Sequence, residues 1–538
     1  MNWKPYFARA GKGLAFFLIA ALLFCLITRI FTPKWSGYWK SSDTVTGFYE
    51  LDEDSIDTLI IGSSQVISGI SPMELYQSAG ISAYSLGTEQ QPVLCSYYLL
   101  REALDTQPNL KAVIFEVTEL FNVCSEASYR KGLDYLPLNA AKWEAIQTHV
   151  AWAEKREAEE NGETAPSALS YVLPIIAYHD RWSQLEQADF TYWRQDRTDP
   201  YRGFSIQTNR GDEGAYEPLG EDASAALAQP DPEAMEAFTN LVSLCKERNI
   251  DLLLLKTPRS DWTAEEHNTT SLLAEQDDLA FLDFNAPQLQ KDIGYDYATD
   301  NLLRSPTHLN LSGAQKVSAY LGDYLTKHCA VADVRGTRAA EALEAELPLY
   351  LAGVEDGNLS LKEDLPNFLL ACQKARYSVL FAVNGRGSDC TFPQADRDAM
   401  TGLGLDTRFC AGGNYLAVLE HGTIPLQQWG GTNLSQSITL ADGAHAALTS
   451  SASGGSISID GVEVDVLSPG LNIVVYNHDS GQVVDAIACR MDEQVVDEKT
   501  GKTEKLPLFQ RQAFKKQHPP GHGRALFSSY CKPKHIYS

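Results

Sequence analysis

The chain has 538 residues, of which 44% are apolar and 21% charged, so it is long enough for two or three packed domains. Its formal net charge of −26 excludes a general nucleic-acid-binding protein, because phosphate contacts need clustered Lys and Arg. Its ten cysteines form no Cys-x-x-Cys pair and no Cys/His cluster with zinc spacing, so we expect neither a metal nor an organic cofactor.

The N-terminal segment predicts a membrane helix. Residues 14–28 are an uninterrupted apolar run, and with their neighbours the segment 13–31 approaches the roughly 20 residues that span a bilayer. Three basic residues within residues 1–12 place the N-terminus in the cytoplasm. Because no Ala-x-Ala site follows, we predict an uncleaved, single-pass signal anchor in the cell membrane with both later domains extracellular. A cleaved secretion signal is the alternative.

After a connector at residues 32–50, residues 51–330 alternate between strand and helix patterns. Apolar runs predict buried strands at 58–61, 112–117, 250–255 and 280–284, and helical periodicity predicts helices at 92–105, 233–249 and 312–325. Continuous apolar strands separated by helices are typical of a parallel sheet covered on both faces. We therefore predict a doubly wound α/β domain whose ligands bind beyond the carboxyl ends of its strands.

The second half of the chain differs from the first in composition and in the pattern of apolar residues. Residues 331–375 are rich in Ala, Glu and Leu and predict a helical linker. Residues 376–493 contain Gly-rich turns and short alternating strands, with Asp460-Gly461 as a hairpin turn signal, and predict a smaller β-rich domain. Residues 494–538 are basic and lack apolar periodicity, so we predict a disordered tail.

Two short motifs in the α/β domain carry candidate chemistry. Ser64 directly follows an apolar strand in Ile61-Gly62-Ser63-Ser64, and His308 precedes the last predicted helix in His308-Leu309-Asn310. A hydroxyl is a poor nucleophile unless a base lies within hydrogen-bond reach and donors stabilise the oxyanion. Ser64 is the candidate nucleophile and His308 the candidate base, and Gly87 can offer a backbone N–H to the oxyanion.

These motifs extend into a family resemblance that covers about residues 50–330. The domain resembles the SGNH/GDSL-type hydrolase superfamily, in its membrane-anchored, DltD-like branch, through residues 61–66, 71–72, 84–87, 91–92, 96–100, 178–182, 256–258, 262, 267–268, 308–310 and 313–314. The resemblance implies that Ser64 is the nucleophile, His308 the base and Gly87 an oxyanion donor. Relatives of this type transfer or remove acyl groups on cell-surface polysaccharides, some beside a membrane-bound O-acyltransferase.

The chain departs from that family at the third member of the triad. The family has Asp three residues before the histidine, where this chain has Ser305. Losing the acid of a triad can cost roughly 10⁴ in rate. Asp300 or Asp296 can substitute from the same loop, or Ser305 leaves a Ser–His dyad, or the site has decayed. The family's oxyanion Asn has no match either, since the equivalent strand end reads Glu116-Val117-Thr118.

Candidate substrate-binding residues lie at several places. Gln91 belongs to the resembling motifs, and Lys256 ends a predicted strand on the ligand side of the sheet. His179, Arg181 and Trp182 belong to a long insertion at 125–230, which we expect to shape a cleft. Arg181 can bind an anion and Trp182 can stack on a sugar ring, although a buried polar cluster that anchors the insertion is equally consistent.

The β-rich region also resembles a known domain. Through residues 376–379, 402–405, 414–418, 470–476 and 481–485 it resembles the interleukin-like EMT inducer domain. That resemblance implies a compact β sandwich that binds glycans or partners. The whole chain thus predicts an envelope-anchored O-acyltransferase or acyl-esterase that acts on cell-surface glycan. The alternative is a catalytically inactive glycan-binding or scaffold protein that kept the fold.

Overall fold

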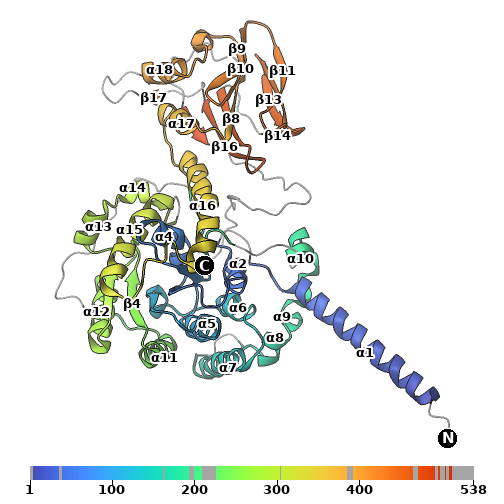
Figure 1. Ribbon diagram of the computed structural model, residues 1–538, viewed down its shortest axis with the longest axis vertical. Helices are drawn as coiled ribbons and strands as arrows, with labels where there is room; N and C mark the ends of the chain where they lie inside the picture. The colour runs from blue at the N-terminus through green and yellow to red at the C-terminus, as the bar shows by residue number, and fades with distance from the viewer. Residues whose placement is uncertain are drawn as a thin grey trace. The chain divides into compact units, whose positions relative to one another are not determined.

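The computed structural model divides into two compact units, Met1–Leu351 (unit 1) and Ala352–Ser538 (unit 2), which are described separately (Figure 1). The structure describes residues 4–35, 39–160, 164–192, 199–208, 226–302, 305–384, 392–464, 470–490, 495–496, 503–504 and 508–511.

Unit 1 begins with a long apolar helix, α1 (Lys4–Phe31). Its segment Lys12–Phe31 has a mean hydropathy of 2.6 over 20 residues, and none of its residues is buried in the protein. A helix that is apolar all round needs an apolar environment on every side. By length and composition α1 can cross a membrane, which is consistent with a signal anchor or a signal peptide.

A five-stranded parallel sheet forms the centre of unit 1 and confirms the predicted α/β class. Its spatial order is β2 (Ala83–Gly87), β1 (Thr58–Gly62), β3 (Ala112–Glu116), β4 (Asp251–Lys256), β5 (Ala280–Asp283). The four strands expected from apolar runs are present. Strand β2 was not predicted because Ala-Tyr-Ser-Leu-Gly contains no continuous apolar run, although the fold buries it completely.

Helices cover both faces of this sheet, as a doubly wound fold requires. One face packs on α5 (Val93–Thr106) and α11 (Pro232–Arg248), and the other on α4 (Pro72–Ala79) and α15 (Leu311–His328). Alternate residues along each strand supply the two cores: Leu59 and Ile61 face one, while Ile60 faces the other. Strand side chains alternate between faces, so a strand buried on both faces reads as a continuous apolar run.

Strand β1 pairs with β2 on one side and β3 on the other, so the direction of winding reverses between β1 and β3. In doubly wound sheets this switch point opens a crevice at the carboxyl ends of the strands. The segments that close the unit around this edge are α3 (Ser64–Gly69), η1 (Thr118–Leu120), α12 (Ala264–Asp277), α13 (Pro287–Ile293), α14 (Tyr297–Asp300), β6 (Asn301–Leu302) and β7 (Ser305–Leu309).

The insertion after β3 is helical. It comprises α6 (Glu126–Leu133), α7 (Ala140–Glu160), α8 (Ala168–Val172), α9 (Ile175–Tyr178), η2 (His179–Ser183) and α10 (Gln187–Thr191). The elements α9, η2 and α10 contact α1, and α9 and α10 lie beside the end of α1 nearest the domain in Figure 1. The connector after α1 adds α2 (Ser41–Phe48), which packs on β2 and α6.

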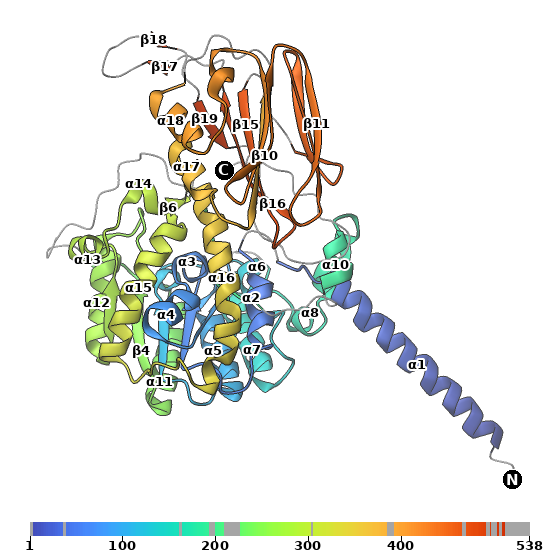
Figure 2. The same ribbon diagram turned by 45° about the horizontal axis from the view of Figure 1, so that its top comes forward.

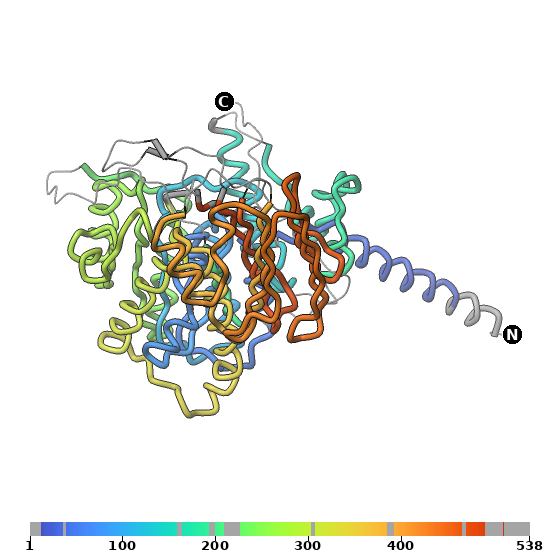
Figure 3. Tube along the Cα trace, turned by 90° about the horizontal axis from the view of Figure 1, so that it is seen from above, coloured from blue at the N-terminus to red at the C-terminus, as the bar shows by residue number. Residues whose placement is uncertain are grey.

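Unit 2 contains a six-stranded and a four-stranded antiparallel sheet, besides a short antiparallel pair of strands, which confirms the predicted β-rich second domain (Figures 2 and 3). The six-stranded sheet runs β10 (Thr423–Gly430), β9 (Asn414–Glu420), β8 (Tyr377–Asn384), β15 (Gly470–Asn477), β16 (Gln482–Arg490), β19 (Leu508–Arg511). The four-stranded sheet runs β11 (Leu434–Thr439), β12 (His445–Ser451), β13 (Gly454–Ile459), β14 (Val462–Val464).

Apolar side chains from both sheets form one core between them. Asp460 and Gly461 join β13 to β14 with φ values of 50° and 77°, the positive values that a two-residue hairpin turn requires. The region 331–375 is helical as predicted, with η4 (Arg338–Ala340), α16 (Glu341–Ser360) and α17 (Leu365–Ala371). Further short elements are α18 (Gln394–Gly402), η5 (Thr407–Ala411), β17 (Val495–Val496) and β18 (Thr503–Glu504).

Strand β19 differs from the expectation of a disordered tail over 494–538. Its residues pair with β16, and Phe509 packs on the ring of Phe368 with the centroids 5.9 Å apart. Four residues carry too little pattern to predict a strand, and the edge of the sheet supplies the missing partner. Residues 494, 497–502, 505–507 and 512–538 of the predicted tail lie outside the described residues.

Candidate active site

Ser64 lies at the carboxyl end of β1, on the turn into α3. The turn depends on Gly62, because a Cβ at that position would lie 2.8 Å from the Cβ of Glu116 on the neighbouring strand. Ser63 is the N-cap of α3, and its hydroxyl accepts a hydrogen bond from the backbone N–H of Gln65 at 3.4 Å. Ser64 is therefore the first helical residue, where a backbone N–H has no partner within the helix.

His308 comes from β7 and meets Ser64. The distance from Ser64 Oγ to His308 Nε2 is 2.8 Å, a good hydrogen bond between residues 244 positions apart. Gln65 holds the two segments together: its Nε2 donates to the carbonyl of Thr307 at 2.7 Å, and its Oε1 accepts from the hydroxyl of Thr257 at 2.7 Å. The buried Gln65 amide thus ties the serine turn to the ends of β4 and β7.

The environment keeps the His308 imidazole neutral. Burial, together with the smaller effect of the positive charges of Arg259 and Lys256, lowers the pKa of His308 to about 3, and the opposing charge of Asp261 only partly offsets this. A neutral imidazole can accept the Ser64 proton at Nε2 only if Nδ1 carries the hydrogen. That Nδ1 lies 3.0 Å from the hydroxyl oxygen of Thr307, which can accept it.

Trp39, from the connector after α1, covers the histidine. The indole and imidazole centroids are 4.6 Å apart with the rings inclined at 33°. Ser64 itself is only 7% exposed. The connector thus contributes to the burial that keeps His308 neutral.

A buried ion pair lies under this site at the switch point. Lys256 Nζ is 2.7 Å from Glu116 Oε1 and donates to the Thr118 hydroxyl at 2.6 Å, and both charged side chains are 0% exposed. The other Glu116 oxygen accepts from Ser63 Oγ at 3.3 Å, so the pair reaches the residue next to the candidate nucleophile.

The residues that the sequence predicts for the site differ in how deeply they lie at the carboxyl edge of the parallel sheet. Lys256, predicted to bind substrate, lies beneath the site, and a cation–π contact of 5.3 Å to the Trp262 ring encloses it further. Gly87 is level with Gly62 on the adjacent strand, at the same edge of the sheet as Ser64. A Cβ on Gly87 would lie 2.5 Å from Val66 of α3, so this close approach excludes any larger residue.

Gln91 is buried near the end of β2. Its Nε2 donates to the carbonyl of Leu86 at 3.3 Å and to Ser96 Oγ at 3.0 Å. This places the side chain in the loop between β2 and α5, within the protein interior.

Asp296 precedes α14 and Asp300 is its last residue, and both carboxylates accept hydrogen bonds. Asp300 accepts from the Asp296 backbone N–H, the Ser312 hydroxyl and Lys316 Nζ, each at 2.7 Å. Asp296 is the N-cap of α14 and accepts from the Ala298 N–H at 3.1 Å. The carboxylate of Asp300 thus ties α15 to the preceding loop. The Ser305 side chain lies outside the described part of the chain.

His179, Arg181 and Trp182 lie beside α1 and make no contact with Ser64 or His308. Arg181 donates to the backbone carbonyl of Phe31, the last residue of α1, and forms an ion pair with Asp189 at 3.3 Å. Trp182 is 73% exposed. Arg181 lines a cavity of about 510 Å³ together with Lys34 and Asp189, and none of the residues around Ser64 lines it.

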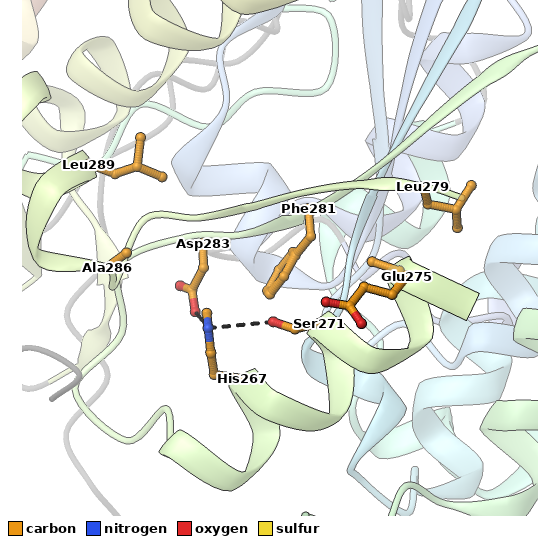
Figure 4. A pocket seen from close by; sticks show the side chains of 9 residues that line it. His267, Ser271, Glu275, Leu279, Phe281, Asp283, Ala286 and Leu289 are labelled. Carbon is orange, nitrogen blue, oxygen red and sulfur yellow. Dashed lines mark hydrogen bonds and ion pairs between the residues drawn. The ribbon is translucent and has the colours of Figure 1, made fainter. Parts of the chain in front are cut away.

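A second serine, histidine and aspartate converge elsewhere on unit 1 (Figure 4). His267 Nδ1 donates to Asp283 Oδ2 at 2.6 Å, and Ser271 Oγ is 3.5 Å from His267 Nε2. They line a cavity of about 330 Å³. Ser271 and His267 are one turn apart in the middle of α12, where the backbone N–H groups are bonded within the helix and offer no oxyanion site.

Sequence reasoning missed Gln65 and Trp39 as parts of the site, whereas Thr257 belongs to the segment 256–258, which it placed on the ligand side of the sheet. Gln65 directly follows the candidate nucleophile, which was a usable signal, whereas nothing local in the connector points to Trp39. Within the described residues, no group of three His, Cys, Asp or Glu side chains could hold a metal ion. No protein-family model matches this chain, and no curated protein matches it.

Proposed function

We propose that this protein is a membrane-anchored, extracytoplasmic SGNH-type serine O-acyltransferase or acyl-esterase that acts on cell-envelope polysaccharide. The single observation that carries the proposal is the 2.8 Å contact between Ser64 Oγ and His308 Nε2 at the switch point of the sheet. Two of the motifs that resemble the DltD-like branch of the superfamily, residues 61–66 and 308–310, supply the two side chains of this contact.

The proposed reaction proceeds through an acyl-enzyme. Ser64 Oγ attacks the acyl carbonyl of the donor and passes its proton to His308 Nε2. His308 then returns that proton to the leaving group as the carbon–heteroatom bond of the donor breaks. A sugar hydroxyl or water next gives its proton to His308 and attacks the acyl carbonyl. The bond between the acyl carbon and Ser64 Oγ then breaks, and His308 returns the proton to Ser64 Oγ. The enzyme is a transferase if the sugar hydroxyl reaches the acyl-enzyme first and an esterase if water does.

Three features support this chemistry. The pKa of His308, lowered to about 3, keeps the imidazole neutral at physiological pH, so that its Nε2 can accept the hydrogen bond of the Ser64 hydroxyl. The Ser64 backbone N–H and the Gly87 backbone lie at the same edge of the sheet, where an oxyanion would form. Thr307 supplies a neutral acceptor for His308 Nδ1 in place of a carboxylate, which favours a Ser–His pair over a full triad.

The second candidate is an inactive envelope protein that binds glycan. The observation that favours it is the low exposure of Ser64, 7%, together with the Trp39 ring over His308. In either case we propose that unit 2, with its resemblance to the interleukin-like EMT inducer domain, is a glycan-binding appendage. A membrane-bound O-acyltransferase is the partner that the family resemblance implies.

The decisive experiment is mass spectrometry of the purified full-length protein after treatment with a fluorophosphonate, with Ser64→Ala and His308→Ala as controls. We expect an adduct on Ser64 that is absent from both variants. Circular dichroism and thermal denaturation establish that the variants are folded. A folded wild-type protein without a Ser64 adduct would reject the catalytic proposal and favour the glycan-binding one.

A further inference from the structure

The helical insertion presents exposed apolar side chains where it meets α1. Each of the three elements that contact α1 carries one: Ile176 on α9 is 42% exposed, Trp182 on η2 is 73% exposed and Phe190 on α10 is 48% exposed. We call these three residues the interface trio. Large apolar side chains grouped on one face of a protein mark an interaction site.

Polar contacts fix where the helical insertion lies along the chain axis of α1. Arg181, next to Trp182, donates to the carbonyl of Phe31 at the end of α1. Asp189, next to Phe190, lies 3.7 Å from Lys34, and Tyr135 donates to the carbonyl of Pro33 at 2.6 Å. The insertion is therefore attached to the first residues that follow the apolar segment of α1. In Figures 1 and 2, α10 lies beside this end of α1 in both views.

We propose that the interface trio docks on the outer leaflet of the bilayer and fixes the orientation of unit 1 on the membrane. The proposal rests on the membrane anchoring in the proposed function. If α1 spans the bilayer up to Phe31, side chains held around residues 31–34 lie at the level of the lipid headgroups. Trp is enriched at that level, where its ring meets both apolar and polar surroundings.

The occupant is lipid because the trio belongs to elements that contact α1, whose segment Lys12–Phe31 has no residue buried in the protein. Charge does not provide the attraction, since a chain with a net charge of −26 is repelled by anionic headgroups. The basic residues at this face, Lys34 and Arg181, are both paired with Asp189. Docking is therefore expected on zwitterionic lipid and does not require anionic headgroups.

Docking would also keep the candidate active site near the membrane. Trp39, which contacts His308, follows Phe31 by eight residues, so their Cα atoms are at most about 28 Å apart. An acyl donor or acceptor attached to a lipid lies within that range of the surface. The fixed orientation would therefore favour membrane-tethered substrates over soluble ones.

The test uses full-length protein in phosphatidylcholine nanodiscs, with p-benzoylphenylalanine replacing one residue at a time. Positions 176, 182 and 190 test the trio. Position 22 in α1, where Leu22 is 70% exposed, is the control for membrane insertion, and position 272 on α12, where Leu272 is 39% exposed, is the matched control away from α1. After irradiation, mass spectrometry identifies lipid adducts.

We expect lipid adducts at positions 22, 176, 182 and 190 and none at 272, with the same pattern in phosphatidylglycerol. Adducts at 22 without adducts at the trio would overturn docking and leave the proposed enzyme intact. No adduct at 22 would overturn docking together with the membrane anchor. Adducts that require anionic lipid, adducts at 272, or cross-links in cells to a protein in place of lipid would also reject the proposal.

Discussion

Two serine–histidine arrangements in unit 1 differ in what surrounds the hydroxyl. Ser271, His267 and Asp283 include the acid of a full triad, and Asp283 is anchored further by Trp262 Nε1 at 2.8 Å. Ser64 and His308 have a shorter serine–histidine contact, 2.8 Å against 3.5 Å, and Thr307 in place of an acid. Ser64 alone begins a helix at the carboxyl edge of a parallel sheet.

A serine, a histidine and an acid in contact therefore indicate a catalytic site less reliably than the position of the serine in the fold does. An oxyanion needs backbone or side-chain donors that the fold leaves unbonded, and these occur at the start of a helix and not in its middle. A carboxylate beside a histidine is common wherever the two can form a hydrogen bond, as in the His267–Asp283 contact, where the histidine side chain is 34% exposed and the aspartate 3%.

The largest expected difference between the two arrangements comes from replacing the bases. His308→Gln keeps a polar side chain of similar size but removes the proton acceptor, so fluorophosphonate labelling of Ser64 should slow by about 10²- to 10⁴-fold. The matched variant His267→Gln should leave the rate unchanged. Time courses of adduct formation by mass spectrometry measure both rates, and equal losses in the two variants would contradict the assignment.

A smaller effect is expected from Gln65→Met, which removes both hydrogen bonds that hold the β7 segment against α3. Displacing His308 by about an ångström should slow labelling of Ser64 by roughly 10- to 10²-fold. Gln107→Met is the matched control, because Gln107 is equally buried and bonds to the Ser55 and Ile56 N–H groups and the Asp52 carbonyl. It should lower the melting temperature without slowing the labelling reaction.

The rate at which the fluorophosphonate labels Ser64 should not change with pH in the range where an ordinary histidine titrates. With the pKa of His308 near 3, the base stays neutral at pH 5, so the labelling rate should hold between pH 8 and pH 5. A histidine with the usual pKa of about 6.5 would lose roughly 30-fold at pH 5. A rate that falls below pH 6.5 would show that His308 is accessible to solvent protons.

The same lowered pKa predicts the pH dependence of stability. Between pH 6.5 and 3 the unfolded chain binds a proton at His308 that the folded chain does not, so this residue makes the fold less stable as the pH falls through that range. His308→Gln should therefore lose less stability than the wild type on acidification from pH 8 to pH 5. Urea denaturation at both pH values measures the difference.

The smallest effect is expected from Ser271→Ala. Because no oxyanion donors surround Ser271, it should not react with the fluorophosphonate, and its loss should change neither the rate nor the site of labelling. An adduct on Ser271 that disappears in His267→Gln would reverse the comparison and make the cavity of Figure 4 the active site.

The sequence by itself determined the α/β class, the second β-rich region and the apolar N-terminal helix. Apolar runs such as 250–255 specify a strand buried on both faces because each side of the strand meets a core. The turn at Asp460-Gly461 was equally readable, since few residues accept positive φ. These signals are local, and a short window of sequence contains them completely.

Only the tertiary structure decided how the site is assembled. Ser64 and His308 are 244 positions apart in the sequence. Their contact depends on the packing of β7 against α3, which the hydrogen bonds of Gln65 to Thr307 and Thr257 hold in place. Nothing near Trp39 or Arg181 in the sequence indicates that the first covers His308 while the second contacts the end of α1. Long-range contacts depend on how whole elements pack, and so the neighbours of a polar side chain are not contained in its own stretch of sequence.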